Sequence, residues 1–174
     1  MESLPAELWR LVLEFDPTYR ELFSRDVLPG VRRTVWLYHP NGRLFCRFRT
    51  DNAGLRDGSY TETYPSGLLR RTARYRAGVL DGVVRDFHPD GTLFRFSVFR
   101  DGKIRENALD FFPGISGACS RFFSYDDESH PHGLCVDFFP DGHRMKQRTY
   151  HHGLLRGIYR LYTEEGDVLS SFYF

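Results

Sequence analysis

The side chains best suited to chemistry in this chain are its seven histidines, two groups of which are close in sequence. His130 and His132 flank a proline directly after the acidic run 126–128. Imidazole and carboxylate groups are ordinary zinc ligands, but a metal site needs converging ligands and outer groups that orient them. One polar loop rarely supplies both. We therefore favour a solvated loop and predict no metal site.

The second group, His151-His152, occupies a short segment whose equivalents elsewhere in the chain read Arg76-Ala77 and Arg100-Asp101. Such a polar segment is explained by a turn that faces solvent. The remaining three histidines flank proline- or glycine-containing turns, and we predict them to be surface residues: His39, His88 and His143.

Cysteine and serine side chains give no sign of a catalytic nucleophile. Cys46, Cys119 and Cys135 have no metal-binding spacing, and their odd number indicates reduced thiols in an intracellular compartment. Ser116 and Ser120 lack a Gly-x-Ser-x-Gly context, and no glycine-rich phosphate loop is present. We predict that the protein is not an enzyme and has neither catalytic residues nor a cofactor.

The charges are balanced along the chain. Lys and Arg number 24 against 23 Asp and Glu, which gives a net charge of +1. Acidic residues are interleaved with the arginines, so we predict cross-strand pairing with Asp86, Asp110 or Asp137 and no nucleic-acid partner. Near-neutral charge also disfavours a membrane surface. The sequence shows no signal peptide and no apolar run long enough to cross a bilayer.

Evenly spaced glycines divide most of the chain into repeats. In the best-formed repeat Gly78 and Gly82 stand four apart, and Gly91 follows nine later inside Pro-Asp-Gly. Turn positions Gly42, Gly67, Gly91, Ile115, Gly142 and Gly166 are separated by 25, 24, 24, 27 and 24 residues. A fixed period of this size indicates a stacked repeat. Later repeats conserve the spacing at Gly142, Gly153, Gly157 and Gly166, and departures fall at Glu106, Ile115 and Ser129.

Each repeat is predicted to be a β-hairpin. Proline and glycine set the turn, and the intervening segments are rich in β-branched, aromatic and arginine residues. A lone hairpin buries too little to stand by itself, so neighbours have to share a buried stripe. We predict aromatic rungs eight residues after the turn (Tyr75, Phe99, Phe123, Tyr150, Phe174) and four before it (Tyr38, Phe87, Phe111, Phe138, Tyr162). Leu44, Leu69, Leu93 and Val168, two after the turn, complete the stripe, and the repeat around Ile115, which also carries the longest insertion at 126–132, is expected to be irregular.

Residues 1–30 do not follow the repeat. Leu4, Leu8, Leu11, Val12 and Phe15 fall at helical spacing, and Asp16-Pro17 separates a second helix. We expect a helical hairpin that caps the first edge of the sheet. The run Leu4-Pro5-x-Glu7-Leu8-x-x-x-Val12 resembles the opening of an F-box. That resemblance implies docking to the Skp1 subunit of a cullin ubiquitin ligase through Leu4, Pro5, Leu8 and Val12.

From residue 31 the skeleton resembles a MORN repeat, most closely the variant of bacterial antitoxin-type repeat proteins. Tyr75 to Leu93 carries it best: an aromatic residue, the two glycines four apart and the turn Pro-x-Gly-x-Leu. The resemblance implies an elongated antiparallel sheet of stacked hairpins that contacts proteins or membrane surfaces. An F-box-like start followed by such repeats also resembles a gene family expanded in large DNA viruses.

The sequence therefore predicts a mainly β protein with a helical cap over residues 1–30 and a repeat array over 31–174. Its predicted function is a non-catalytic interaction or structural module, in the cytoplasm or as part of a virus particle. The apolar last strand suggests a protein partner at Phe172 and Phe174. A ubiquitin-ligase adaptor and a membrane-surface protein remain as alternatives.

Overall fold

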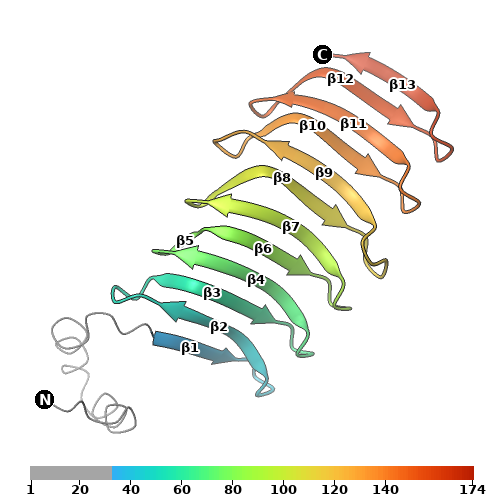
Figure 1. Ribbon diagram of the computed structural model, residues 1–174. Coiled ribbons are helices and arrows are strands. Elements are labelled where there is room, and N and C mark those ends of the chain that lie inside the picture. Colours follow the sequence, from blue (N-terminus) through green and yellow to red (C-terminus); the bar gives the residue numbers. More distant parts are fainter. Residues whose placement is uncertain (1–32) are drawn as a thin grey trace, which may run out of the picture.

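The computed structural model describes residues 33–174, and all strands in this range belong to one antiparallel sheet of thirteen strands (Figure 1). No helix occurs among these residues. The predicted mainly β fold and its division into hairpin repeats are confirmed. The helical cap, with Leu4, Pro5, Leu8 and Val12, lies outside the described residues.

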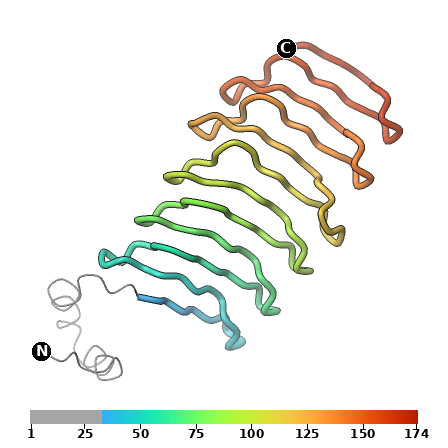
Figure 2. Tube along the Cα trace, viewed as in Figure 1, coloured from blue at the N-terminus to red at the C-terminus, as the bar shows by residue number. Residues whose placement is uncertain are grey.

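Strands that follow one another in sequence lie side by side in the sheet, from β1 to β13, except that β5 pairs only with β4 and the order continues through β6. Figure 2 shows the chain running back and forth along a twisted ladder, with hairpin turns on one long margin and inter-repeat turns on the other. The strands are β1 (Arg33–Tyr38), β2 (Leu44–Thr50), β3 (Arg56–Thr63), β4 (Leu69–Arg76), β5 (Val79–Leu80), β6 (Gly82–Phe87), β7 (Leu93–Arg100), β8 (Lys103–Phe111), β9 (Cys119–Tyr125), β10 (Pro131–Phe138), β11 (Arg144–His151), β12 (Leu154–Tyr162) and β13 (Val168–Tyr173).

The repeat glycines are required by the backbone of the turns. At the β6–β7 turn the N–H of His88 donates to the carbonyl of Thr92 at 2.8 Å, and Gly91 donates back to His88 at 2.9 Å. Gly91 has a φ of 89°, in the left-handed region that favours glycine. Six further glycines of the skeleton share this conformation, with φ from 80° to 119°: Gly78, Gly82, Gly142, Gly153, Gly157 and Gly166.

Two positions keep the conformation although the glycine is gone. Glu106 has a φ of 60° and Ser129 a φ of 72°. The Ser129 hydroxyl accepts a hydrogen bond from the N–H of Ile104 at 2.8 Å, which helps to hold its loop. These departures from the repeat therefore change the residue and not the path of the chain.

The prediction that Ile115 stands in for the turn glycine is wrong. In the β8–β9 loop Phe112 donates to the carbonyl of Ala118, as His88 does to Thr92, so Gly117 is the turn glycine, with a φ of 78°. Two extra residues in this loop displaced the alignment. With Gly117 the steps are 26 residues from Gly91 and 25 to Gly142, and the repeat is more regular than the sequence indicated.

The longest insertion was also placed wrongly. In the β9–β10 loop Asp126 donates to the carbonyl of His130 at 3.0 Å, and Ser129 donates to Asp126 at 3.1 Å. The β2–β3 loop closes in the same way between Asp51, Gly54 and Leu55. Residues 126–130 therefore form a regular turn of the array, and the insertion lies in the β8–β9 loop.

The core is made of smaller side chains than predicted. The most buried apolar residues are Cys46, Tyr60, Ala73, Val84, Ala108, Cys135 and Val136. The predicted rungs Phe99 and Tyr150, like Leu93, are half-buried; Phe99 packs against this core, and Phe174 is exposed. In a single-layer sheet, large side chains keep one side toward solvent, whereas small residues in the strand centres are covered by their cross-strand neighbours.

Cross-strand pairing aligns five of these residues in a central row, whereas Cys46 pairs with Glu62 and Val136 lies on the opposite face from Cys135. Tyr60 pairs with Ala73 and Val84 with Ser97. The row runs through every hairpin from Phe48 to Phe172: Phe48, Tyr60, Ala73, Val84, Ser97, Ala108, Phe123, Cys135, Arg148, Tyr159 and Phe172. A register shift just before each hairpin turn, such as that between Asp86 and Phe87, recurs in all six hairpins and adds twist to the sheet.

A charged row lies on the same face, two residues along each strand from the central row. Its acidic and basic residues alternate from strand to strand: Glu62, Arg71, Asp86, Arg95, Asp110, Arg121, Asp137 and Lys146. Arg95 holds Asp110 through two bonds of 2.6 and 2.8 Å. Asp137 accepts from Arg121 at 2.9 Å and from Arg148 at 2.8 Å. The pairing predicted for Asp86, Asp110 and Asp137 is present, with one buried or half-buried carboxylate in each of three hairpins.

Candidate functional site

The last strand presents a free hydrogen-bonding edge. Phe174 exchanges both backbone hydrogen bonds with Gly157, at 2.9 and 2.7 Å. Because hydrogen-bonded pairs alternate along antiparallel strands, the N–H groups of Ser171 and Tyr173 point away from β12. Among the described residues β13 pairs with β12 alone. This edge can therefore accept another strand.

Exposed apolar side chains lie on both faces of this edge. Phe172 is 54% exposed and Phe174 60%, and both contact Tyr159 with ring centroids 6.1 and 6.2 Å apart. Leu169 and Tyr173, on the alternate positions, are 68% and 83% exposed. Phe172 and Phe174, the sequence-predicted partner residues, thus share one face and form a single aromatic patch with Tyr159.

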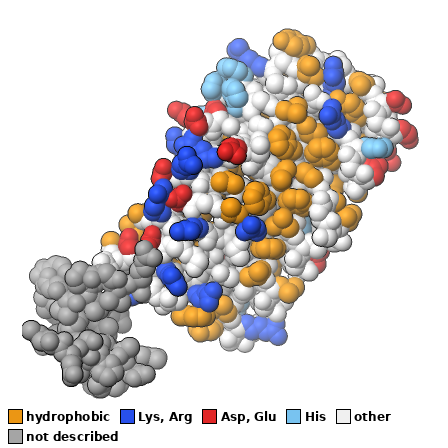
Figure 3. Space-filling model, in the orientation of Figure 1, with side chains coloured by type: hydrophobic (Ala, Val, Ile, Leu, Met, Phe, Trp, Pro, Cys, Tyr) orange, Lys and Arg blue, Asp and Glu red, His pale blue; other side chains and the backbone are white. Residues whose placement is uncertain are grey.

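Figure 3 shows how side-chain types are distributed over one face of the molecule. Hydrophobic side chains form a broad band along the sheet, while basic and acidic side chains concentrate at the margin of the inter-repeat turns. A groove of about 790 Å³ at this margin is lined by side chains of both signs, among them Asp81, Lys103 and Arg105, and contains neither Cys nor His. The groove is therefore a surface of mixed charge.

The cysteines are poorly suited to nucleophilic chemistry. Burial raises the pKa of Cys46, and the nearby Glu62 carboxylate raises it further. Burial likewise raises the pKa of Cys119 and of Cys135, which is completely buried. A raised pKa leaves little of the reactive thiolate at neutral pH. Cys46 and Cys135 are small core residues, and Cys119 is half-buried.

The histidines beside the hairpin turns have a structural role that the sequence did not reveal. His39 lies 2.9 Å from the carbonyl of Thr63, and His88 lies 3.2 Å from that of Phe111. His143 makes the same kind of contact with Glu164 at 2.6 Å. Each ring thus hydrogen-bonds the backbone of the next hairpin. The signal available in the sequence was their recurrence just before or after the turn.

The structure also brings together histidines that the sequence analysis treated separately. His132 lies beside His151 and His152, whereas His130 lies 3.5 Å from Asp126 in the preceding turn. Asp126 accepts hydrogen bonds from the backbone N–H groups of Glu128 and His130 and from the His152 ring. Desolvation alone would raise the pKa of Asp126, but these bonds outweigh it and hold the pKa well below its ordinary range. Alignment of the inter-repeat turns would have revealed this cluster.

Comparisons with known proteins identify no family. No family model matches the chain, and no curated protein matches it. Among solved structures, a complex of an S. aureus TarM mutant with fondaparinux, alpha-GlcNAc-glycerol and UDP aligns with a TM-score of 0.34 at 13% identity, over 80% of this chain and 23% of that one. A second TarM structure aligns with a TM-score of 0.32 at 13% identity, over 80% of this chain and 24% of that one. The chain thus spans about a quarter of these proteins, and likenesses this weak carry no argument.

No helix in the described range is long and apolar enough to span a membrane.

Proposed function

We propose that this chain is a non-catalytic interaction or structural module that docks a protein partner at the edge of β13. The observation that carries the proposal is that β13 has outward-pointing N–H groups at Ser171 and Tyr173 and exposed aromatic side chains on the same strand. A partner strand added to this edge gains main-chain hydrogen bonds, and the alternating side chains supply specificity.

Three further features support the proposal. Exposed, apolar sheet edges favour association, and proteins commonly blunt them with charges, prolines or short strands. β13 spans six residues and contains none of these devices. The raised pKa values of the cysteines support a non-catalytic assignment. The MORN-like skeleton supports the elongated-scaffold form of the proposal, including a role as a component of a larger assembly such as a virus particle.

A proline at Ser171 tests the edge directly. Ser171 is exposed and its N–H faces away from β12, so Ser171→Pro removes a donor for a partner strand without breaking a ladder bond to β12. Ser171→Ala removes the same hydroxyl but keeps the N–H and is the matched control. Affinity purification of the full chain from its source cells should recover partners with the wild type and Ser171→Ala, and lose them with Ser171→Pro. Undiminished recovery with Ser171→Pro would refute docking at this edge.

The other two hypotheses remain predictions. Docking to Skp1 depends on residues that the structure does not describe, and its test is co-purification with Skp1 that disappears on Leu8→Asp. Membrane-surface binding is tested by sedimentation with anionic vesicles at low salt. In the described range basic side chains alternate with acidic ones along the charged row, which favours the protein partner over an anionic membrane.

A further inference from the structure

Three imidazole rings meet at the margin of the inter-repeat turns, near the C-terminal end of the sheet. His132 lies on β10, His151 ends β11, and His152 stands in the β11–β12 turn with a φ of 46°. Their ring centroids are 4.5, 4.7 and 5.0 Å apart. One nitrogen from each ring lies within 4.8 Å of the others. Three nitrogen donors from two strands and a turn therefore converge on one point.

The earlier repeats show that the fold does not require histidine here. The N–H of Gly153 donates to the carbonyl of Pro131 at 2.8 Å, just as Gly102 donates to Leu80 at 2.8 Å. This shared bond makes His132 equivalent to Asp81 and His152 equivalent to Asp101. In the earlier repeat both carboxylates pair with Arg76, at 2.5 and 3.1 Å. The same turn is thus built once on an ion-pair network and once on three imidazoles, so turn formation does not explain the histidines.

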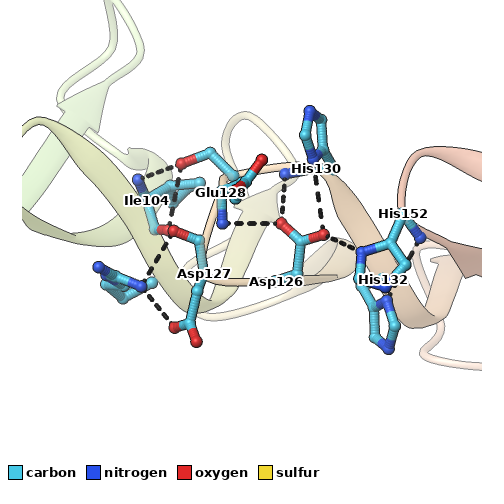
Figure 4. Close-up of polar contacts among 9 residues, drawn as sticks. Ile104, Asp126, Asp127, Glu128, His130, His132 and His152 are labelled. Carbon is cyan, nitrogen blue, oxygen red and sulfur yellow. Dashed lines mark hydrogen bonds and ion pairs between the residues drawn. The ribbon is translucent and has the colours of Figure 1, made fainter.

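A half-buried carboxylate orients one of the rings. Asp126 Oδ2 accepts a hydrogen bond from His152 Nδ1 at 2.7 Å, and the Asp126 side chain is only 11% exposed (Figure 4). With its proton fixed on Nδ1, His152 has the lone pair of Nε2 available for a ligand. This carboxylate–histidine contact is the outer-shell arrangement that accompanies most histidine metal ligands, where it fixes the tautomer and raises ligand basicity.

The contacts of His132 are compatible with coordination. Its Nδ1 accepts only a long hydrogen bond, 3.3 Å, from the backbone N–H of His152. Losing this bond when the ring binds an ion costs little. The rings are half-buried or exposed, so side-chain rotation can close the remaining distance to Zn–N bonds of about 2.0–2.1 Å.

We propose that His132, His151 and His152 form a binding site for a divalent transition metal of the zinc, nickel and copper class, with Asp126 as the residue that orients His152. Imidazole donors favour these ions over magnesium and calcium, which take oxygen ligands. Three protein ligands leave further coordination positions to solvent. The ion would connect β10 to the β11–β12 turn and so stabilise the last two repeats against local unfolding.

The test is titration of the full chain with Zn²⁺ by calorimetry and with Co²⁺ by visible absorption. We expect saturation at one equivalent, a higher melting temperature with Zn²⁺, and no sulfur-to-cobalt charge-transfer band. Saturable binding should be lost in both His132→Gln and His152→Asn, asparagine being chosen because it tolerates the left-handed backbone. Asp126→Asn, which keeps an acceptor for His152, should weaken binding about 10–100-fold.

His143→Gln is the matched control, because His143 is also exposed beside a turn but contacts only the β12–β13 turn and its own turn residue Asp141. It should bind Zn²⁺ like the wild type. Circular dichroism of each variant without metal establishes that it is folded. Non-saturable binding, a sulfur charge-transfer band, or equal loss in His143→Gln would each overturn the proposal. So would full retention of binding in folded His132→Gln and His152→Asn.

Discussion

The middle of the sheet and its last hairpin follow the same plan, yet they bury very different amounts of side chain. In β8 and β10 the central row holds Ala108 and Cys135, which are 1% and 0% exposed. In β13 the same row holds Phe172, which is 54% exposed. The charged row also differs between the two regions. In the middle it holds the buried carboxylates of Asp110 and Asp137, whereas in the last hairpin the same positions hold the uncharged residues Leu161 and Ser170.

This comparison shows where stability comes from in a single-layer sheet. A residue in the middle is covered by strands on both sides, whereas a residue in the last strand has a neighbour on one side. Small side chains are enough in the middle because flanking strands exclude water, and large aromatics remain exposed at the end because nothing in the described range covers them. Interior positions are therefore expected to contribute more to stability than terminal positions do.

We expect the largest loss of stability when a buried ion pair in the middle of the sheet is broken. Arg95→Ala leaves the carboxylate of Asp110, which is 5% exposed, without its two hydrogen bonds. We expect a loss of about 3 kcal/mol in the free energy of unfolding, the low end of the range for breaking a buried pair, because Arg121 lies opposite and can compensate in part. Urea denaturation measures it.

The control is a pair at the surface. Arg76→Ala removes ion pairs to Asp81 and Asp101 from an arginine side chain that is 62% exposed. We expect a change of about 0–1 kcal/mol. Equal losses in Arg95→Ala and Arg76→Ala would show that the buried charged row contributes no more than surface pairs do.

The next effect in size compares the loss of an aromatic ring in the middle of the sheet with the loss of one in the last hairpin. Phe99 is half-buried and packs against the core around Ala73 and Val84. Phe99→Ala should cost about 2 kcal/mol, less than the 3–5 kcal/mol of a fully buried ring. Phe172→Ala should cost less than about 1 kcal/mol but reduce partner recovery. Thermal melting compares the variants, and a greater loss of stability in Phe172→Ala would reverse the proposed division between core and edge.

A smaller effect is expected where the repeat has lost a glycine. Glu106 is exposed and holds a φ of 60°, which costs about 1–2 kcal/mol for a residue with a side chain. Glycine loses more entropy on folding, by about 0.5–1 kcal/mol. Glu106→Gly should therefore stabilise the protein by about 0.5–1 kcal/mol in urea. Lys103→Gly, three residues earlier in the same strand, should destabilise it, and stabilisation by both would refute the backbone explanation.

An effect of similar size at neutral pH concerns Tyr60, which donates to Glu62 at 2.9 Å. Burial raises the pKa of Tyr60 above its ordinary value of 10.0, and the bond to Glu62 raises it further. Because the folded-state pKa is raised, the corresponding stability is complete below pH 10 and lost as the pH rises toward the folded pKa. Tyr60→Phe should cost about 0.5–1.5 kcal/mol at pH 7 and show a weaker alkaline loss than wild type. An unchanged alkaline limb would place Tyr60 outside the core.

The sequence predicted what depends on local backbone chemistry. Pro-Asp-Gly91 and the glycine period specify hairpins and their length, because positive φ angles favour glycine whatever surrounds it. The sequence did not predict which side chains are buried. That depends on pairing across repeats, which brings Ser97 beside Ala108 and exposes Phe174. Because the β8–β9 loop contains two extra residues, the repeat spacing assigned the turn position to Ile115 in place of Gly117.

The histidine cluster was missed for the same reason. His132 and His151 are far apart in sequence and meet only because Gly133 pairs with Tyr150 across β10 and β11. Among the residues near it in sequence, His132 has one other histidine, His130. Comparison of equivalent turns would have shown three histidines in the places of Asp81, Arg100 and Asp101.

Amide hydrogen exchange on the full native chain tests the central claim, that one continuous sheet is most stable in its middle and open at β13. We predict the slowest exchange in β7–β10. Within β13 we predict alternation, with Ser171 and Tyr173 exchanging fast and Phe172 and Phe174 more slowly. Fast exchange throughout β8 and β9, or protection of Ser171 and Tyr173 equal to that of Phe172 in the isolated protein, would contradict the account.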